Sequence, residues 1–204
     1  MIFHSINLHE FTVPILAKIS VFVMFFLLSG FSAGAEELWR LRYFVPTAAE
    51  SQIKLGSSKA TGKLNTSGHS ANLVFANGIG LGYSTVHSNG SLEGVSYIFK
   101  NYCLDLSYTI GDSLGFTLGA GLLINGRGEL SFNGVSYATE NSTGEAVFMN
   151  FGIPFFGGEL LLGYRQNNIK YKNFQSQVSG QSVTLADSVK LISGQVNVGI
   201  GFLF

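Results

Sequence analysis

The chain has 204 residues, of which 12 are Lys or Arg and 12 are Asp or Glu, so its formal net charge is zero. Only 12% of the residues are charged, against about 25% in an ordinary globular domain, while 46% are hydrophobic. The neutral balance argues against nucleic acid as a partner, and the single cysteine excludes an intramolecular disulfide and a cysteine-based zinc site. The shortage of charge indicates a surface that does not all face water.

The first predicted element is a short apolar run near the N-terminus. Residues 19–28 read ISVFVMFFLL, Lys18 precedes them, and SAGA follows at 32–35. A positive residue, a short apolar run and a small-residue A-x-A site predict a secretory signal peptide over residues 1–35, cleaved near Ala35. The run is shorter than the roughly 20 residues that span a bilayer. The mature domain then covers residues 36–204, and the long stretch before Lys18 leaves open a start codon farther downstream.

Alternation of apolar with small or polar residues continues through the rest of the chain and predicts strands. In the last segment Val196, Val198, Ile200, Phe202 and Phe204 share one parity, and Gln195, Asn197, Gly199 and Gly201 share the other. The same pattern predicts eight strands at about 37–46, 68–76, 78–87, 94–111, 114–126, 144–154, 158–171 and 189–204.

Within the fourth predicted strand the apolar residues change parity between Phe99 and Tyr102. This change predicts a bulge or kink near Lys100 and Asn101. The connections between strands alternate in length. Short ones are expected at 76–78, 111–113 and 155–157, and long polar ones at 47–67, 88–93, 127–143 and 173–188. Asn77-Gly78 is a strong signal for a tight hairpin, in which Leu73 would lie opposite Leu81.

The alternation does not say which face is buried. In a soluble barrel of the lipocalin type the apolar residues face inward, whereas in a transmembrane barrel they face lipid. Four features favour lipid: glycines and scattered charges on the polar face, aromatic residues near strand ends, short turns alternating with long loops, and strands of spanning length. An open edge in hydrocarbon would leave backbone groups unpaired, so the first strand should pair with the last. The predicted fold is all-β, an eight-stranded antiparallel transmembrane up-and-down β-barrel.

The end of the chain reads Asn197-x-Gly199-x-x-Phe202-x-Phe204. This stretch resembles the C-terminal assembly signal of bacterial outer-membrane barrels, whose last strand is recognised by the insertion machinery. With the signal peptide and the eight strands, the mature chain resembles small outer-membrane barrels of the OmpA-domain, OmpX, OmpW and opacity-protein type. The resemblance implies the outer membrane of a Gram-negative bacterium, with its lipid and lipopolysaccharide and the barrel-assembly machinery as partners.

Charged residues on the predicted inward face are expected to pair in the lumen, because charges out of water need partners. They are Arg40, Arg42, Asp105, Glu159 and Arg165. A polar network that stiffens the barrel is the first interpretation, and a path for protons or ions is the alternative. Cys103 has the same inward parity and is expected to be a small filler.

His69 and His87 are predicted to be diagonal neighbours on the outward face, near the ends of adjacent strands. Such a pair could serve a metal or a lipid-modifying reaction at the rim, with Ser67, Ser70, Ser84 or Ser88 nearby. Polar residues at the membrane interface are the simpler interpretation, because no local motif singles out a serine or a third group. The sequence therefore predicts no catalytic, cofactor-binding or metal-binding residue.

These observations predict a non-enzymatic outer-membrane barrel with a structural or surface-interaction role through its extracellular loops, which could contact an extracellular ligand. One alternative is a narrow, OmpW-like channel for ions or small apolar solutes. A rim-sited lipid-modifying enzyme and a soluble carrier are the others.

Overall fold

The computed structural model describes residues 39–55, 58–63, 65–92, 94–111, 114–176, 184–185 and 188–204. The chain divides into two units, Met1–Ala35 and Glu36–Phe204, and every described residue belongs to the second. The predicted signal peptide and its cleavage site therefore lie outside the described residues. None of the described residues belongs to a helix long and apolar enough to cross a membrane.

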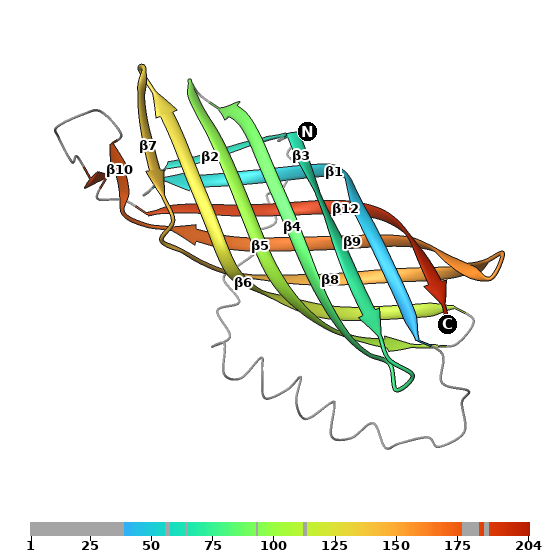
Figure 1. Cartoon of the computed structure of the whole chain (residues 1–204). Helices are drawn as coiled ribbons and strands as arrows, with labels where there is room; N and C mark the ends of the chain where they lie inside the picture. Colours follow the sequence, from blue (N-terminus) through green and yellow to red (C-terminus); the bar gives the residue numbers. More distant parts are fainter. Residues whose placement is uncertain are drawn as a thin grey trace, which may run out of the picture. The chain divides into compact units, whose positions relative to one another are not determined.

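Eight long strands form one closed ring. They are β1 (Arg40–Leu55), β3 (Asn65–Val74), β4 (Ile79–Leu92), β5 (Val95–Ile110), β6 (Gly115–Phe132), β8 (Ser142–Phe155), β9 (Gly158–Tyr171) and β12 (Val189–Leu203). Each pairs antiparallel with its neighbours, and β1 pairs with β12 from Arg40–Leu203 to Leu55–Val189, which closes the barrel (Figure 1). The predicted eight-stranded antiparallel barrel, with its first strand paired to its last, is confirmed.

Four short strands lie within the long connections: β2 (Ser58–Lys63), β7 (Val135–Thr139), β10 (Phe174–Ser176) and β11 (Thr184–Leu185). Of these, β2 pairs with β1, while β7 pairs with β6 and β10. In Figure 1, β7 and β10 lie at one end of the barrel, called here the long-loop end. The C-terminus and the β3–β4 and β8–β9 turns lie at the other, the short-turn end.

The β3–β4 turn has the predicted geometry, the β8–β9 turn has two residues, 156 and 157, in place of the three predicted at 155–157, and residues 112–113 of the third predicted short turn lie outside the described residues. Gly78 has φ of +83° and its N–H donates to Phe75 O at 2.9 Å, while Leu73 lies opposite Leu81 as expected. Phe156 and Gly157 both have positive φ, the conformation required by a two-residue hairpin whose twist matches the strands.

The apolar parity faces outward. Leu41, Leu81, Leu104 and Leu162 are 42–55% exposed, whereas the inward-facing Arg42 and Asp105 are each 1% exposed. A soluble carrier would have the opposite arrangement, with apolar side chains inside, so the soluble interpretation is wrong.

The predicted bulge near Lys100 and Asn101 is also wrong. In and out positions alternate without interruption along the whole of β5, so Tyr97 and Phe99 point inward together with Asn101. The irregularity lies on the partner strand instead: Tyr102 is opposite Asn125 and Cys103 is opposite Leu123, which leaves Ile124 as the extra residue of β6. The apolar residues of β5 therefore move from outward-facing to inward-facing positions of one regular strand.

Several strands run farther than the sequence predicts. β1 continues from residue 46 to Leu55 past a bulge between Pro46 and Ala48, and β6 continues from residue 126 to Phe132. Much of the predicted loops 47–67 and 127–143 is thus strand. These extensions present polar residues outward and apolar residues inward, which is the pattern of a sheet that stands in water.

Candidate functional site

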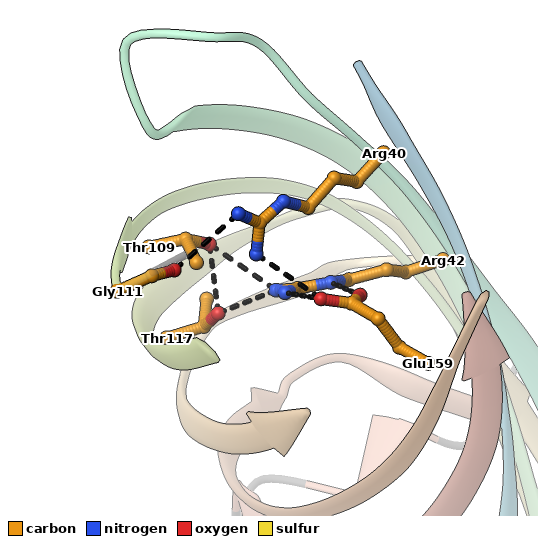
Figure 2. A network of polar contacts seen from close by, with 6 residues as sticks. All are labelled: Arg40, Arg42, Thr109, Gly111, Thr117 and Glu159. Carbon is orange, nitrogen blue, oxygen red and sulfur yellow. Dashed lines mark hydrogen bonds and ion pairs between the residues drawn. The ribbon is translucent and has the colours of Figure 1, made fainter. Parts of the chain in front are cut away.

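The lumen near the short-turn end holds a cluster of two arginines and one glutamate (Figure 2). Alternation along β1 turns Arg40 and Arg42 inward, and Glu159 projects from the start of β9 to meet them. Glu159 accepts hydrogen bonds from Arg42 Nε at 2.8 Å, Arg42 Nη2 at 3.0 Å and Arg40 Nη1 at 3.1 Å. Arg42 Nη1 also donates to Thr117 Oγ1 at 2.6 Å and to Thr109 Oγ1 at 3.2 Å. These residues, called the Arg–Glu cluster, are all buried.

Glycines make room for this cluster. A Cβ at Gly115 would lie 2.8 Å from Arg42 Nη2, and one at Gly201 would lie 2.7 Å from Glu159 Oε2. Real Cβ contacts are not that short, so neither position accepts a larger residue without displacing a charged group. Gly115 and Gly201 thus leave the space that these large charged side chains occupy in the lumen.

A second ion pair lies farther along the lumen. Arg165 on β9 donates to both carboxylate oxygens of Asp105 on β5, at 2.8 and 3.0 Å. Its Nε donates to Asn167, which donates onward to Ser193 at 3.2 Å, and its guanidinium lies 5.4 Å from the ring centre of Phe148. The five predicted lumen residues therefore lie inside the barrel in two groups. Hydrogen bonds among the described residues do not join these groups.

Beside Arg165 the lumen leaves little free space. A cavity lined by Phe44, Ser84, Arg165, Gln195 and Asn197, among others, has a volume of about 10 Å³. That is barely enough for one water molecule. Ser84 and Gln195 line this cavity, and Ser84 Oγ and Gln195 Nε2 have no hydrogen-bond partner among the described residues.

Apolar residues fill the lumen at the long-loop end. This upper apolar cluster consists of Ile53, Tyr97, Phe99, Leu130, Ile169, Tyr171, Phe174, Val189 and Leu191, all buried. The rings of Phe99 and Tyr171 stack with centres 4.8 Å apart, and the Tyr171 hydroxyl donates to Asn101 at 2.6 Å. Sequence reasoning missed the cluster, because it took the parity change in β5 as a bulge. Two features of the sequence could have indicated it. One is the change of face of the apolar residues in β5, and the other is that Ile169 and Tyr171 are apolar residues at the inward positions of β9.

The outer surface at the level of the cluster is more polar than that of the rest of the barrel, although Ile98, between Tyr97 and Phe99, is 43% exposed on it. Next to Tyr171, the outward-facing residues of β9 and β12 are Lys170 and Lys190, not apolar side chains. Burial raises the pKa of the Tyr171 phenol above its ordinary value, so this group remains a neutral donor to Asn101 at physiological pH.

The two histidines are diagonal neighbours, as predicted: His69 lies opposite Thr85, and Ser67 lies opposite His87. His69 stacks on Tyr43 with centres 6.0 Å apart, and His87 meets Tyr102 edge-on at 6.1 Å. Ser84 and Ser88 are buried on the inward face. Within the described part of the chain no hydrogen bond joins a serine to either histidine, and no group of three or more His, Cys, Asp and Glu could hold a metal.

The predicted assembly-signal residues occupy both faces of β12. Asn197 is buried in the lumen, while Phe202 and Phe204 are 49% and 68% exposed on the outer face. A Cβ at Gly199 would meet the backbone of Tyr43 and the ring of Phe44, so the close pairing of β1 with β12 requires glycine there. Recognition of this strand by the assembly machinery stays a prediction.

No protein-family model matches the sequence. No curated protein matches it either. Solved structures are similar in fold. Neisserial surface protein A (NspA) superposes with a TM-score of 0.57 and 16% identity, over 83% of this chain and 100% of its own. Ail, the attachment invasion locus protein of Yersinia pestis, superposes with a TM-score of 0.50 and 18% identity, over 82% of this chain and 100% of its own. Similarity at this level concerns the fold, and the chain therefore has the fold of the small eight-stranded transmembrane barrels of the bacterial outer membrane.

Proposed function

We propose that the protein is an integral barrel of the bacterial outer membrane, non-enzymatic, with a structural or surface-interaction role at its long-loop end. The observation that carries this proposal is a barrel with an apolar outer surface and a filled lumen. Exposed large apolar residues cover the outside on seven of the eight strands of the ring, all except β3, which far exceeds the patches that soluble monomers expose. Such a surface is stable only in lipid.

The filled lumen argues against a conduit. An ion entering from the short-turn end would meet the Arg–Glu cluster, in which Glu159 is already neutralised by Arg40 and Arg42. At the other end it would meet the upper apolar cluster, where Phe99, Tyr171 and Phe174 are fully buried. Conduction would require both clusters to rearrange, and each is held by buried contacts. A stiff scaffold is the role that this interior supports best.

The length of the strands supports a role at the surface. A tilted strand crosses the membrane with about 9–11 residues, whereas β5 has 16 and β6 has 18. The excess carries a rigid sheet beyond the apolar belt at the long-loop end. The names of the two similar structures, a surface protein and an attachment invasion locus protein, are in keeping with this role.

Two measurements test the proposal. In membrane fractions the protein should appear in the outer membrane and migrate differently on a gel before and after boiling. Recovery from the periplasm without detergent would overturn the location. In planar bilayers the purified protein should be silent. Discrete openings that disappear in Arg42→Gln would replace the structural role with the alternative of a narrow channel.

The non-enzymatic part has its own test. Outer-membrane lipid A prepared with and without the gene should have the same profile. A change that depends on His69 or His87 would favour a rim-sited lipid-modifying enzyme, since those residues carry that alternative.

A further inference from the structure

A polar groove lies on the outer face of the short sheet that β6, β7 and β10 form at the long-loop end (Figure 1). Its volume is about 610 Å³, and pockets that hold small ligands measure about 300–1,000 Å³. Because β7 pairs with β6 on one side and with β10 on the other, Glu129, Ala138 and Gln175 form one row across the three strands. The residues that line this polar groove include Arg127, Ala138, Glu140, Asn141, Asn173 and Gln175.

The groove opens away from the lumen. On β10, Phe174 belongs to the upper apolar cluster, so the next residue, Gln175, points to the opposite face. On β6, a Cβ at Gly128 would lie 3.1 Å from Tyr171 inside the barrel, so its neighbour Arg127 points outward. A ligand therefore reaches the groove from the surroundings of the barrel and not through its lumen.

A small residue produces the hollow. Ala138 stands in the middle of the row, between the longer side chains of Glu129 and Gln175. Its methyl group leaves a depression over the central strand, with the side chains of the two outer strands as walls. Ala138 is thus the floor of the groove, and a larger residue there would fill it.

Two connections form the rim of the groove, and hydrogen bonds hold them together. Residues 140–141 lead from β7 to β8, and residues 172–173 lead from β9 to β10. Lys172 N–H donates to Asn141 O at 2.9 Å, while Thr139 Oγ1 donates to Lys172 O and accepts from Asn141 N–H at 3.1 Å. Asn173 has φ of +56°, a conformation in which asparagine is enriched. The rim therefore holds the backbones that carry the carboxamides of Asn141 and Asn173 in place.

The charges of the groove neutralise one another. Arg127 pairs with Glu129 at 2.8 Å and with Glu140 at 3.8 Å. Both carboxylates lie against the one guanidinium, so it offers no free positive charge to an anion. A phosphate or sulfate group would also meet the two carboxylates, whose negative charge would repel it. The groove is therefore suited to a ligand without net charge.

Three exposed carboxamides line the groove, and their side chains make no hydrogen bond to another residue that the structure describes: Asn141, Asn173 and Gln175. A carboxamide donates hydrogen bonds through its nitrogen and accepts them through its oxygen, so it pairs well with groups that also do both. Hydroxyl groups are of this kind. The described lining contains no aromatic or large aliphatic side chain, which argues against a ligand with a large apolar face. These features together indicate a neutral ligand that is rich in hydroxyl groups.

We propose that the polar groove binds a neutral saccharide chain. Vicinal hydroxyls of such a chain match the carboxamides of the rim, whereas a peptide would bring apolar side chains for which the groove has no pocket. Because the contacts are hydrogen bonds at an exposed surface, each with a small net contribution, a single groove should bind weakly, with a Kd of about 1–10 mM. The inference rests on the proposed function, which places the groove outside the cell, and it gives the surface role a class of ligand.

The test uses the folded full-length mature barrel in micelles of a detergent without a sugar headgroup and measures binding by saturation-transfer NMR of the ligand. The neutral probes are maltotetraose, cellotetraose and chitotetraose. Sucrose octasulfate serves as an anionic saccharide, and tetraglycine as a peptide without side chains. At least one neutral saccharide should receive saturation from the wild type, and more of it than the other two probes do. No transfer to any of the three neutral saccharides would overturn the proposal, as would stronger transfer to sucrose octasulfate or tetraglycine.

A matched pair of variants locates the site. Asn173→Gly removes one carboxamide of the rim and keeps the backbone, because glycine adopts a positive φ without strain, and it should weaken binding at least threefold. Asn133→Gly makes the same change at another asparagine of positive φ, in the β6–β7 turn outside the groove, and should bind as the wild type does. Equal affinities of the two glycine variants would contradict the assignment of the groove.

Ala138→Leu fills the floor of the groove and should abolish the transfer while the barrel remains heat-modifiable on a gel. Undiminished transfer in this folded variant would place the saccharide elsewhere. If fractionation finds the protein outside the outer membrane, the proposed function fails, although the groove can still be tested on the purified barrel. If the protein is in the outer membrane and the wild type transfers no saturation to the neutral saccharides, only the saccharide site fails.

Discussion

Replacing Glu159 by glutamine tests the interior of the barrel most directly. The carboxylate accepts three hydrogen bonds from Arg40 and Arg42, and both arginines are buried. Glu159→Gln keeps the shape of the side chain but leaves two guanidinium groups without their anion. Removal of one partner of a buried ion pair costs about 3–5 kcal/mol. We therefore expect the free energy of unfolding to fall by about that amount.

Urea unfolding of the micelle-bound barrel, followed by the change in gel migration, measures the effect. With a slope of about 2 kcal/mol per molar urea, the midpoint should fall by about 2 M. The matched control is Glu129→Gln, because Glu129 also pairs with an arginine, Arg127, but their side chains are 37% and 46% exposed. Exposed ion pairs contribute about 0–1 kcal/mol to stability, so the urea midpoint of the control variant should hardly change. If Glu159→Gln shifts the midpoint no more than Glu129→Gln does, the Arg–Glu cluster does not stabilise the fold as argued.

Three further predictions use the same preparation. Phe99→Ala should lower the free energy of unfolding by about 3–5 kcal/mol because Phe99 is fully buried. Phe151→Ala should lower it by less because Phe151 is 52% exposed toward lipid. Equal losses would contradict the stabilising role of the upper apolar cluster. Because burial raises the pKa of Tyr171, the folded chain holds the phenol proton more tightly than the unfolded chain does. The contribution of Tyr171 to the free energy of unfolding is therefore complete below about pH 10 and is lost as the pH rises further. Tyr171→Phe should therefore show a shallower fall in stability above pH 10, and parallel pH profiles would refute this. Deletion of Phe204 should lower the fraction of protein that reaches the outer membrane in heat-modifiable form, and full insertion would count against the C-terminal assembly signal.

The number of strands in the barrel ring, their order and the polarity of the two faces of the membrane-spanning part could be predicted from the sequence. In a strand, side chains alternate strictly between the two faces, so the parity of Leu104 and Asp105 already separates the lipid side from the lumen. The turn at Asn77-Gly78 and the closure of β1 on β12 followed from local backbone preferences and from the need to pair every edge in lipid.

The partners inside the lumen could not be predicted in the same way. Parity places Arg42 and Glu159 inside, but their contact joins residues 117 positions apart and depends on the register of the closed ring. The division of the five charged residues into an Arg–Glu cluster and an Arg165–Asp105 pair is therefore a property of the tertiary structure.

The tertiary structure also decided what the parity change in β5 means. The sequence by itself shows that the apolar residues move from one face to the other near Phe99, and a bulge is the local explanation. The barrel supplies another explanation. Below that point the outer face is apolar, as expected in lipid, and above it polar residues such as Lys100 face outward, as expected in water. Apolar residues leave water in both cases, so Leu104 points outward and Phe99 points inward along one unbroken strand. Only the folded ring shows where the solvent changes, because alternation records that two faces differ and not what each face touches.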